Sequence, residues 1–215
     1  PIVDVAEDES VTLILMFAYS FLAMTAYNIL KPITRSKFIA DLGADNLPYV
    51  QLAAGILIGF LMQGYTHATR ALPRKLVIPV TQAGLVGLLL ITWLLFKTGE
   101  AWVSVAFYVL GLILGILLIS QFWTLANDLY DARQAKRLFG FIGGGASLGG
   151  ALGAGLTALV VKEVGTNNLL LVSAAILSVC VGLVVAINKV RSGQERVDPP
   201  LEAVGGLRPP PGLAQ

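Results

Sequence analysis

Residues 122–155 read FWTLANDLYDARQAKRLFGFIGGGASLGGALGAG, and this stretch decides the fold. It joins the end of one apolar segment to the start of another through a short charged connection. Charged side chains are costly inside a bilayer, and long apolar segments are unfavourable in water. The stretch therefore predicts a membrane boundary at its charged centre, with one membrane helix on each side.

The composition of the whole chain also points to a membrane protein. Of its 215 residues, 56% are hydrophobic and 13% are charged. Soluble domains carry about 25% charged residues, so this shortfall indicates contact with lipid. A net charge of +2, spread over separate connections, gives no reason to expect a nucleic-acid partner. The single cysteine, Cys180, excludes an internal disulfide and lies in an apolar run, which is typical of a buried residue.

Six segments are apolar over roughly 20 residues, the length that a helix needs to cross the hydrocarbon core. Their approximate ranges are 11–30, 47–65, 76–96, 102–125, 138–161 and 169–187. Strands are not expected, because the runs lack period-two alternation and an open sheet edge cannot be satisfied in lipid. The sequence therefore predicts an all-α integral membrane protein, with a six-helix transmembrane domain at residues 11–190 in contact with the lipid bilayer.

Two terminal segments flank this domain. Residues 1–10 are acidic and lack the basic start of a signal peptide. Residues 191–215 are rich in proline and glycine and are expected to form a linker or a disordered tail. A six-helix bundle that leads into a linker is typical of half a transporter, whose partner would be a C-terminal six-helix half. The alternative is a complete six-helix protein that pairs with a second copy of itself.

Basic residues in the connections predict the orientation, because they accumulate on the cytoplasmic side. They follow the second, fourth and sixth segments, as Arg70, Arg74 and Lys75, then Arg133, Lys136 and Arg137, then Lys189, Arg191 and Arg196. Both termini are therefore expected in the cytoplasm. The other side has single bases and one cluster, formed by Lys31, Arg35 and Lys37. This cluster is an exception to the charge rule, and such an exception suggests a function.

The cluster follows the first apolar segment, in the sequence AYNILKPITRSKFIADLG. Pro32 cannot donate a backbone hydrogen bond, so we expect the helix to kink or break there. If the helix continues, Asn28, Lys31 and Arg35 share one face and Tyr27 lies on a neighbouring face. Cations beside freed backbone groups suit an anionic ligand such as a phosphate. The alternative is that these cations snorkel to lipid head groups at the end of the helix.

Other polar residues lie within or beside the apolar segments. Gln121 and Asp128 are spaced to share a helical face, which makes Gln121 a further candidate for contact with a solute. Gln51, Gln63 and Gln82 are expected to hydrogen-bond neighbouring helices.

We expect no enzymatic activity, no metal site and no bound cofactor. His67 is the single histidine and has no cysteine nearby, so neither a metal site nor a histidine-dependent triad has support. The motif HExxH is absent from the sequence.

The glycine-rich part of residues 122–155 invites comparison with a phosphate-binding loop. It contains no GK[ST] and follows a membrane helix rather than a strand, so that interpretation lacks its structural context. Gly145, Gly149 and Gly153 are instead spaced by four residues, which gives a smooth stripe along one helix face. The stripe predicts close packing against another helix.

The charged connection in residues 122–155 allows two interpretations. Its charged residues are Asp128, Asp131, Arg133, Lys136 and Arg137. They form either a solvated cytoplasmic turn or a latch of ion pairs that is closed in one transport state and open in another. Exposed pairs contribute about 0–1 kcal/mol each, so a latch needs several of them acting together.

Several motifs of this chain resemble the ATP/ADP translocase (nucleotide transporter) family. They are Phe122-Trp123, Ala126-Asn127-Asp128 and the run ARQAKRLFG followed by the glycine-rich helix, together with YNILKPITRSKF in the first segment. The family is a divergent branch of the major facilitator superfamily, with twelve helices in two six-helix halves. This chain looks like the N-terminal half.

The resemblance implies the exchange of ATP for ADP, or of a related phosphate-bearing anion, by alternating access and without hydrolysis. It implies a bacterial inner membrane as the location and places Lys31 and Arg35 near the phosphates. Nucleotide exchangers of the family carry an acidic residue in the fourth helix, where this chain has Gly111 or a close neighbour. Two alternatives therefore stay open: a major-facilitator-type permease for another solute, and a non-transporting membrane module fused to soluble domains.

Overall fold

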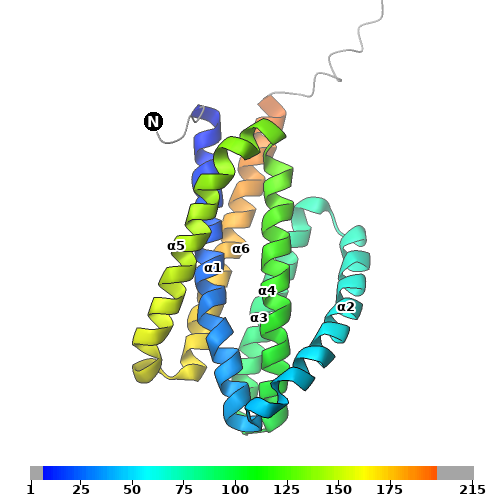
Figure 1. The fold of residues 1–215 in the computed structure, drawn as a ribbon. Coiled ribbons are helices and arrows are strands. Elements are labelled where there is room, and N and C mark those ends of the chain that lie inside the picture. Colours follow the sequence, from blue (N-terminus) through cyan, green and yellow to red (C-terminus); the bar gives the residue numbers. More distant parts are fainter. Residues whose placement is uncertain (1–6, 198–215) are drawn as a thin grey trace, which may run out of the picture.

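The computed structural model describes residues 7–197, which form six long helices and no strand (Figure 1). The helices are α1 (Glu7–Leu42), α2 (Leu47–Ala71), α3 (Arg74–Leu95), α4 (Ala101–Leu129), α5 (Ala132–Val164) and α6 (Thr166–Val197), with short 3-10 helices η1 (Ala44–Asn46) and η2 (Phe96–Thr98). Each long helix is long and apolar enough to cross a membrane. The prediction of an all-α integral membrane protein is thus confirmed.

The first helix is longer than its apolar sequence suggested. Of the kink or break expected at Pro32, the break is wrong, because α1 continues to Leu42 without interruption. Leu30 and Ile33, on either side of the proline, are both buried against the rest of the bundle. Packing therefore holds the helix on both sides of Pro32, and membrane helices tolerate the hydrogen bond that a proline removes.

The two terminal segments are described only in part. The acidic segment is seen from Glu7, where α1 begins, and the expected tail is helical as far as Val197 because α6 extends to that residue. The remainder of both segments, residues 1–6 and 198–215, lies outside the described residues. The division of the chain into these segments stays a prediction.

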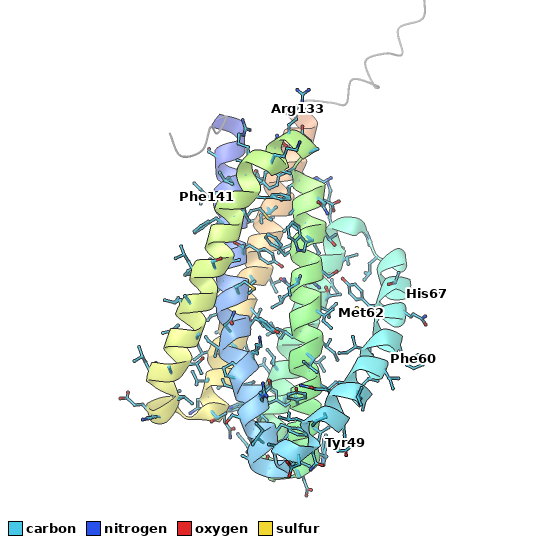
Figure 2. The ribbon with its side chains drawn as sticks, viewed as in Figure 1. Tyr49, Phe60, Met62, His67, Arg133 and Phe141 are labelled. Atoms are coloured by element: carbon cyan, nitrogen blue, oxygen red, sulfur yellow. The ribbon has the colours of Figure 1, made fainter. Side chains whose placement is uncertain are left out.

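Helix α1 is the centre of the bundle. It packs most extensively against α5 and α6, then against α4, while α3 packs on α6. By contrast, α2 lies apart from the other helices and touches α4 lightly (Figure 1). Tyr49 and Phe60 of α2 are 73% and 69% exposed and point away from the bundle, whereas Met62 points toward α4 (Figure 2). Large apolar side chains on such an outer face suit contact with lipid.

The glycine stripe of α5 packs against the backbone of α1. A Cβ atom at Gly149 would overlap the carbonyl of Phe21, and one at Gly153 would overlap the carbonyl of Thr25. At Gly145 a Cβ atom would lie 2.8 Å from Ser20 Oγ. The two helices run in the same direction, and the absence of side chains along the stripe lets their backbones meet.

Two hydroxyl groups of α1 hydrogen-bond across this contact. Ser20 Oγ donates to the carbonyl oxygen of Ile142 at 2.9 Å, and Thr25 Oγ1 donates to that of Gly149 at 3.1 Å. Each hydroxyl also lies within hydrogen-bond distance of a carbonyl oxygen of its own helix. Close packing and interhelical hydrogen bonds together hold membrane helices when the hydrophobic effect cannot.

The connections at one end of the bundle share a glycine turn. Gly43 follows α1, Gly99 precedes α4 and Gly165 separates α5 from α6, and all three have positive φ angles of 73° to 82°. Glycine adopts this backbone conformation without steric cost, so the chain can reverse within few residues. The short connections make successive helices antiparallel (Figure 1).

Candidate functional site

One face of α1 is left open between α4 and α5. Met24, Asn28, Lys31 and Arg35 lie on this face at helical spacing, and Lys31 and Arg35 are exposed. On the side of α5, a Cβ atom at Gly150 would lie 3.4 Å from Asn28 Nδ2. We call Met24, Asn28, Lys31 and Arg35 the open face of α1.

Tyr27 lies at the α4 edge of the open face and links Lys31 to α4. Its ring fills the space that Gly115 leaves, since a Cβ atom there would lie 2.6 Å from Tyr27 Cε2. The Lys31 ammonium lies 6.0 Å from the centroid of this ring, within the range of a cation–π contact. The glycine of α4 thus positions the tyrosine, and the tyrosine lies beneath the cation.

Lys31 is not at the end of its helix. It precedes Leu42, the last residue of α1, by eleven residues, a rise of about 16 Å. The snorkelling alternative assumed that the cations lie at a helix end, where their stems reach the head groups. Lys31 is therefore not at the end of α1. Because α1 has 36 residues and is longer than the hydrocarbon core, the depth of Lys31 in the membrane stays a prediction.

The three cations of the cluster have different surroundings. Lys37 Nζ lies 3.5 Å from Asp41 Oδ2 and 5.4 Å from the centroid of the Phe96 ring. Asp41 also accepts a hydrogen bond from Ser104 of α4, so Lys37 belongs to a contact between the ends of α1 and α4. Among the described residues, Lys31 and Arg35 have no ion-pair partner. These two cations are the ones available to an anionic solute.

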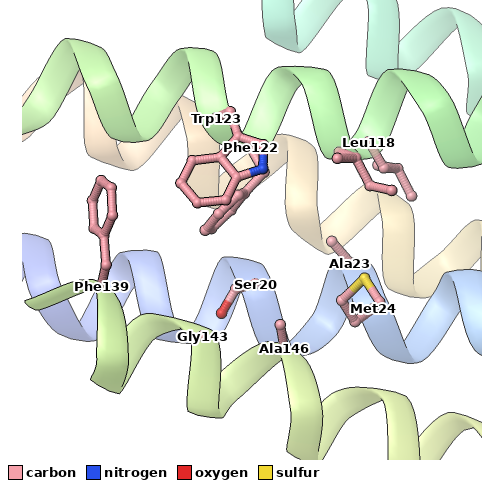
Figure 3. A pocket seen from close by; sticks show the side chains of 10 residues that line it. Ser20, Ala23, Met24, Leu118, Phe122, Trp123, Phe139, Gly143 and Ala146 are labelled. Atoms are coloured by element: carbon pink, nitrogen blue, oxygen red, sulfur yellow. The ribbon is translucent and has the colours of Figure 1, made fainter. Parts of the chain in front are cut away.

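An apolar cavity of about 230 Å³ adjoins the open face, between α1, α4 and α5 (Figure 3). Met24 and Ser20 of α1 line one side of it. Trp123 of α4 and Phe139 of α5 line the other, with their ring centroids 5.6 Å apart in an edge-to-face arrangement. Both aromatic residues belong to the motifs that resemble the translocase family, but nothing in those motifs indicates that their side chains line a cavity.

Gln121 lies apart from the open face. Its side chain is buried, and its Nε2 donates to Thr81 Oγ1 of α3 at 2.6 Å. Gln121 therefore joins α4 to α3, and the structure does not bring it together with Lys31. Gln82 and Gln51 also bond neighbouring helices, through the hydroxyl groups of Tyr19 and Tyr108. Spacing along a helix shows which residues share a face but not which neighbour that face meets.

The charged turn lies at the end of the bundle opposite the glycine turns, where Figure 2 labels Arg133. Asp131 caps α5: its Oδ1 accepts from the backbone N–H groups of Arg133 and Gln134 at 2.8 Å each. The Gln134 side chain accepts from the Asp131 N–H at 3.0 Å, which completes a capping box. Hydrogen bonds from the Gln134 and then the Arg133 N–H lower the pKa of the Asp131 carboxyl.

The other charged residues of the turn lie at or near the surface. Arg133, Lys136 and Arg137 are exposed, and Asp128 is half-buried at the end of α4. The Asp131 carboxylate is engaged by the first turn of its own helix. Across residues 7–197, no three acidic, histidine or cysteine side chains cluster as a metal site would require.

Comparison with known proteins identifies the family. A family model described as TLC ATP/ADP transporter matches residues 80–191, about half of the chain. The matched part runs from α3 to α6 and includes Trp123, the charged turn and the glycine stripe, whereas α1 lies outside it. No curated protein and no solved structure matches the chain. The chain is thus a multi-pass membrane protein that belongs to the TLC ATP/ADP transporter family.

Proposed function

We propose that this protein exchanges nucleotides, such as ATP and ADP, across a membrane by alternating access, and that Lys31 and Arg35 contact the phosphates. The observation that carries the proposal is the open face of α1, where two cations without ion-pair partners among the described residues lie beside a cavity. Arginine can hold a phosphate by two hydrogen bonds, and lysine acts as a point charge beside it. Asn28 and Tyr27 border the same site.

The energetic cost of placing these cations in lipid supports the assignment of the open face to a solute path. Ionisable groups within a membrane segment usually face a bundle interior or a water-filled cavity, because lipid does not solvate charge. If the open face met the hydrocarbon core, lipid would not solvate the charges of Lys31 and Arg35, which have no ion-pair partner among the described residues. We therefore expect a partner to close the path, either a C-terminal six-helix half of major-facilitator type or a second copy of the chain.

The charged turn is the proposed gate. In this proposal Asp128, Asp131, Arg133, Lys136 and Arg137 lie on the cytoplasmic side, as do both ends of the described chain. Ion pairs from this turn to the partner half would hold one state closed. The smooth contact between the glycine stripe and α1 would let the two helices shift relative to each other.

A transport assay tests the proposal. Lys31→Gln should abolish the uptake of labelled ADP in proteoliposomes that hold unlabelled ATP, and Arg35→Gln should reduce it strongly. The amount of inserted protein should not change. Lys97→Gln is the matched control, because Lys97 lies outside the open face, 4.4 Å from the centroid of the Trp93 ring. If Lys31→Gln exchanges nucleotides at the wild-type rate, the assignment of the phosphate site is wrong.

A second candidate function is a permease for another phosphate-bearing or organic anion. It is favoured by Gly111, which stands near the position where nucleotide exchangers of the family carry an acid. A panel of labelled anions without a base, offered to the same proteoliposomes, separates the two functions. Uptake of such anions without any uptake of nucleotides would favour the permease.

A further inference from the structure

We infer that the apolar cavity between α1, α4 and α5 is the subsite for the base of the transported nucleotide, with its ring stacked on Trp123 and Phe139. The inference rests on the proposed function, because it assigns a binding subsite to the base of the same nucleotide whose phosphates Lys31 and Arg35 contact. It also gives a role to Phe122 and Trp123, which take no part in the proposed phosphate site. Figure 3 shows the indole of Trp123 extending from α4 toward α1.

The cavity and the two cations lie along the same face of α1. Met24 lines the cavity, and Lys31 and Arg35 follow it by seven and eleven residues, which are close to two and three helical turns. An occupant of the cavity is therefore in line with the cations. Since the open face with its two cations does not suit lipid, the natural occupant of a cavity on that face is part of the solute.

The spacing along α1 fits a base and a phosphate on one molecule. Side chains on a helix lean toward its N-terminus, and the Lys31 ammonium lies beside the Tyr27 ring, one turn before its own Cα atom. Tyr27 follows Met24 by three residues, a rise of about 5 Å. A ring in the cavity can therefore be joined through a ribose to phosphates at Lys31.

The lining favours the flat face of a ring over its polar edge. Phe122, Trp123 and Phe139 supply aromatic surface, and stacking of bases on aromatic side chains tolerates different bases because every base has a π-face. Ser20 is the one hydroxyl-bearing residue of the lining, and its hydroxyl already donates to backbone carbonyl oxygens. The cavity should therefore accept purines with little discrimination between adenine and guanine.

A binding measurement on the full protein in detergent separates the base from the phosphates. The probes are ADP and methylenediphosphonate, which carries the two phosphorus groups without a base or ribose. Trp123→Ala should weaken ADP about tenfold and leave methylenediphosphonate unchanged. Lys31→Gln should weaken both probes. Trp102→Ala is the matched control, because Trp102 lies at the far end of α4, outside the cavity.

A second variant fills the cavity without removing an aromatic ring. Gly143 lines the cavity, and a Cβ atom there meets no other atom within 4 Å. Gly143→Leu should therefore fold and weaken ADP selectively. Gly155→Leu is its control, since Gly155 also has free space but lies outside the cavity on the same helix.

Three results would overturn the inference. If Trp123→Ala and Gly143→Leu both bind ADP as the wild type does, the cavity does not hold the base and a lipid chain is the better occupant. If the wild-type protein binds ADP no more tightly than methylenediphosphonate, it has no base subsite, although the phosphate site survives. If the wild-type protein binds neither probe, the proposed function fails together with the inference.

Discussion

The methyl group of Thr34 in α1 packs into the space that Gly111 leaves in α4. A Cβ atom at Gly111 would lie 2.7 Å from Thr34 Cγ2, closer than real side chains approach. Thr34 is buried, so it has little room to move. Any side chain at Gly111 would therefore displace Thr34. This contact lies one turn from Lys31, and it joins the open face of α1 to α4.

Gly111→Ala should destabilise the protein by about 1–3 kcal/mol, because it overpacks the contact with Thr34. Thr34→Ser removes the methyl group that would clash, so the double variant should regain most of the loss. The measurement is a double-mutant cycle on thermal unfolding in detergent. Additive effects of the two substitutions would show that Thr34 is not the residue that excludes a side chain at Gly111.

Gly149→Ala should destabilise the protein more than alanine substitutions at other glycines in the glycine-rich part of α5. Its new methyl group would overlap the backbone of Phe21, which a rotamer change cannot move. We expect a melting temperature lower by several degrees, since about 1–3 kcal/mol of overpacking corresponds to that shift. Gly144→Ala is the control, because a Cβ atom at Gly144 meets nothing within 4 Å. Equal melting temperatures for the two variants would contradict the packing of α1 on the stripe.

The Asp131 cap should make the stability of α5 sensitive to acid. The pKa of this carboxyl is lowered in the folded protein, so its contribution is present above the ordinary aspartate pKa of about 4 and is lost as the pH falls through the lowered value. An asparagine side chain can cap the helix without titrating, so Asp131→Asn should retain stability at neutral pH and lose less of it on acidification. Melting curves between about pH 3 and pH 7 compare the variant with the wild type. Parallel losses in both proteins would show that another group causes the acid sensitivity.

Removing one partner of the hydrogen bond between Gln82 and Tyr19 should destabilise the protein more than removing both partners. Gln82 Nε2 donates to the Tyr19 hydroxyl at 2.6 Å, and both side chains are buried. Either Gln82→Leu or Tyr19→Phe leaves a polar group without this partner, at a cost of about 1–3 kcal/mol. The double variant should be close to the wild type in melting temperature. A double variant that is as unstable as the sum of the single changes would exclude the pair as a coupled unit.

The sequence predicts the helices well but not the full length of α1. Its apolar run ends at Leu30, and the following residues are polar enough to suggest a connection. The helix continues because Ile33, Thr34 and Phe38 are buried against neighbouring helices, and this burial outweighs the local signal of Pro32. Tertiary packing decides the end of the helix, and packing cannot be read from hydropathy.

The sequence predicts the charged residues of the site but not the residues that line its cavity. The positions of Lys31 and Arg35 at helical spacing follow from the sequence alone. The cavity requires α1, α4 and α5 in one register, which places Met24 opposite Trp123 and Phe139. Likewise, the glycine spacing indicates a close contact, but the identity of α1 as the neighbour depends on the arrangement of the whole bundle. Which neighbour a helix face meets is a tertiary property.

The central claim is that the open face of α1 lines the path of the solute. The most direct test places one cysteine at Asn28, on that face, in a protein whose buried Cys180 is replaced by alanine. This leaves Lys31 and Arg35 intact for the solute. The control places the cysteine at Leu159 of α5, which is 78% exposed on the outside of the bundle. The measurement is the rate of reaction with a charged, membrane-impermeant thiosulfonate in proteoliposomes, with and without ADP.

We predict that the cysteine at position 28 reacts faster than the one at position 159, and that ADP slows its reaction. If position 28 reacts no faster than position 159, or if ADP has no effect on its rate, the open face of α1 does not line the solute path.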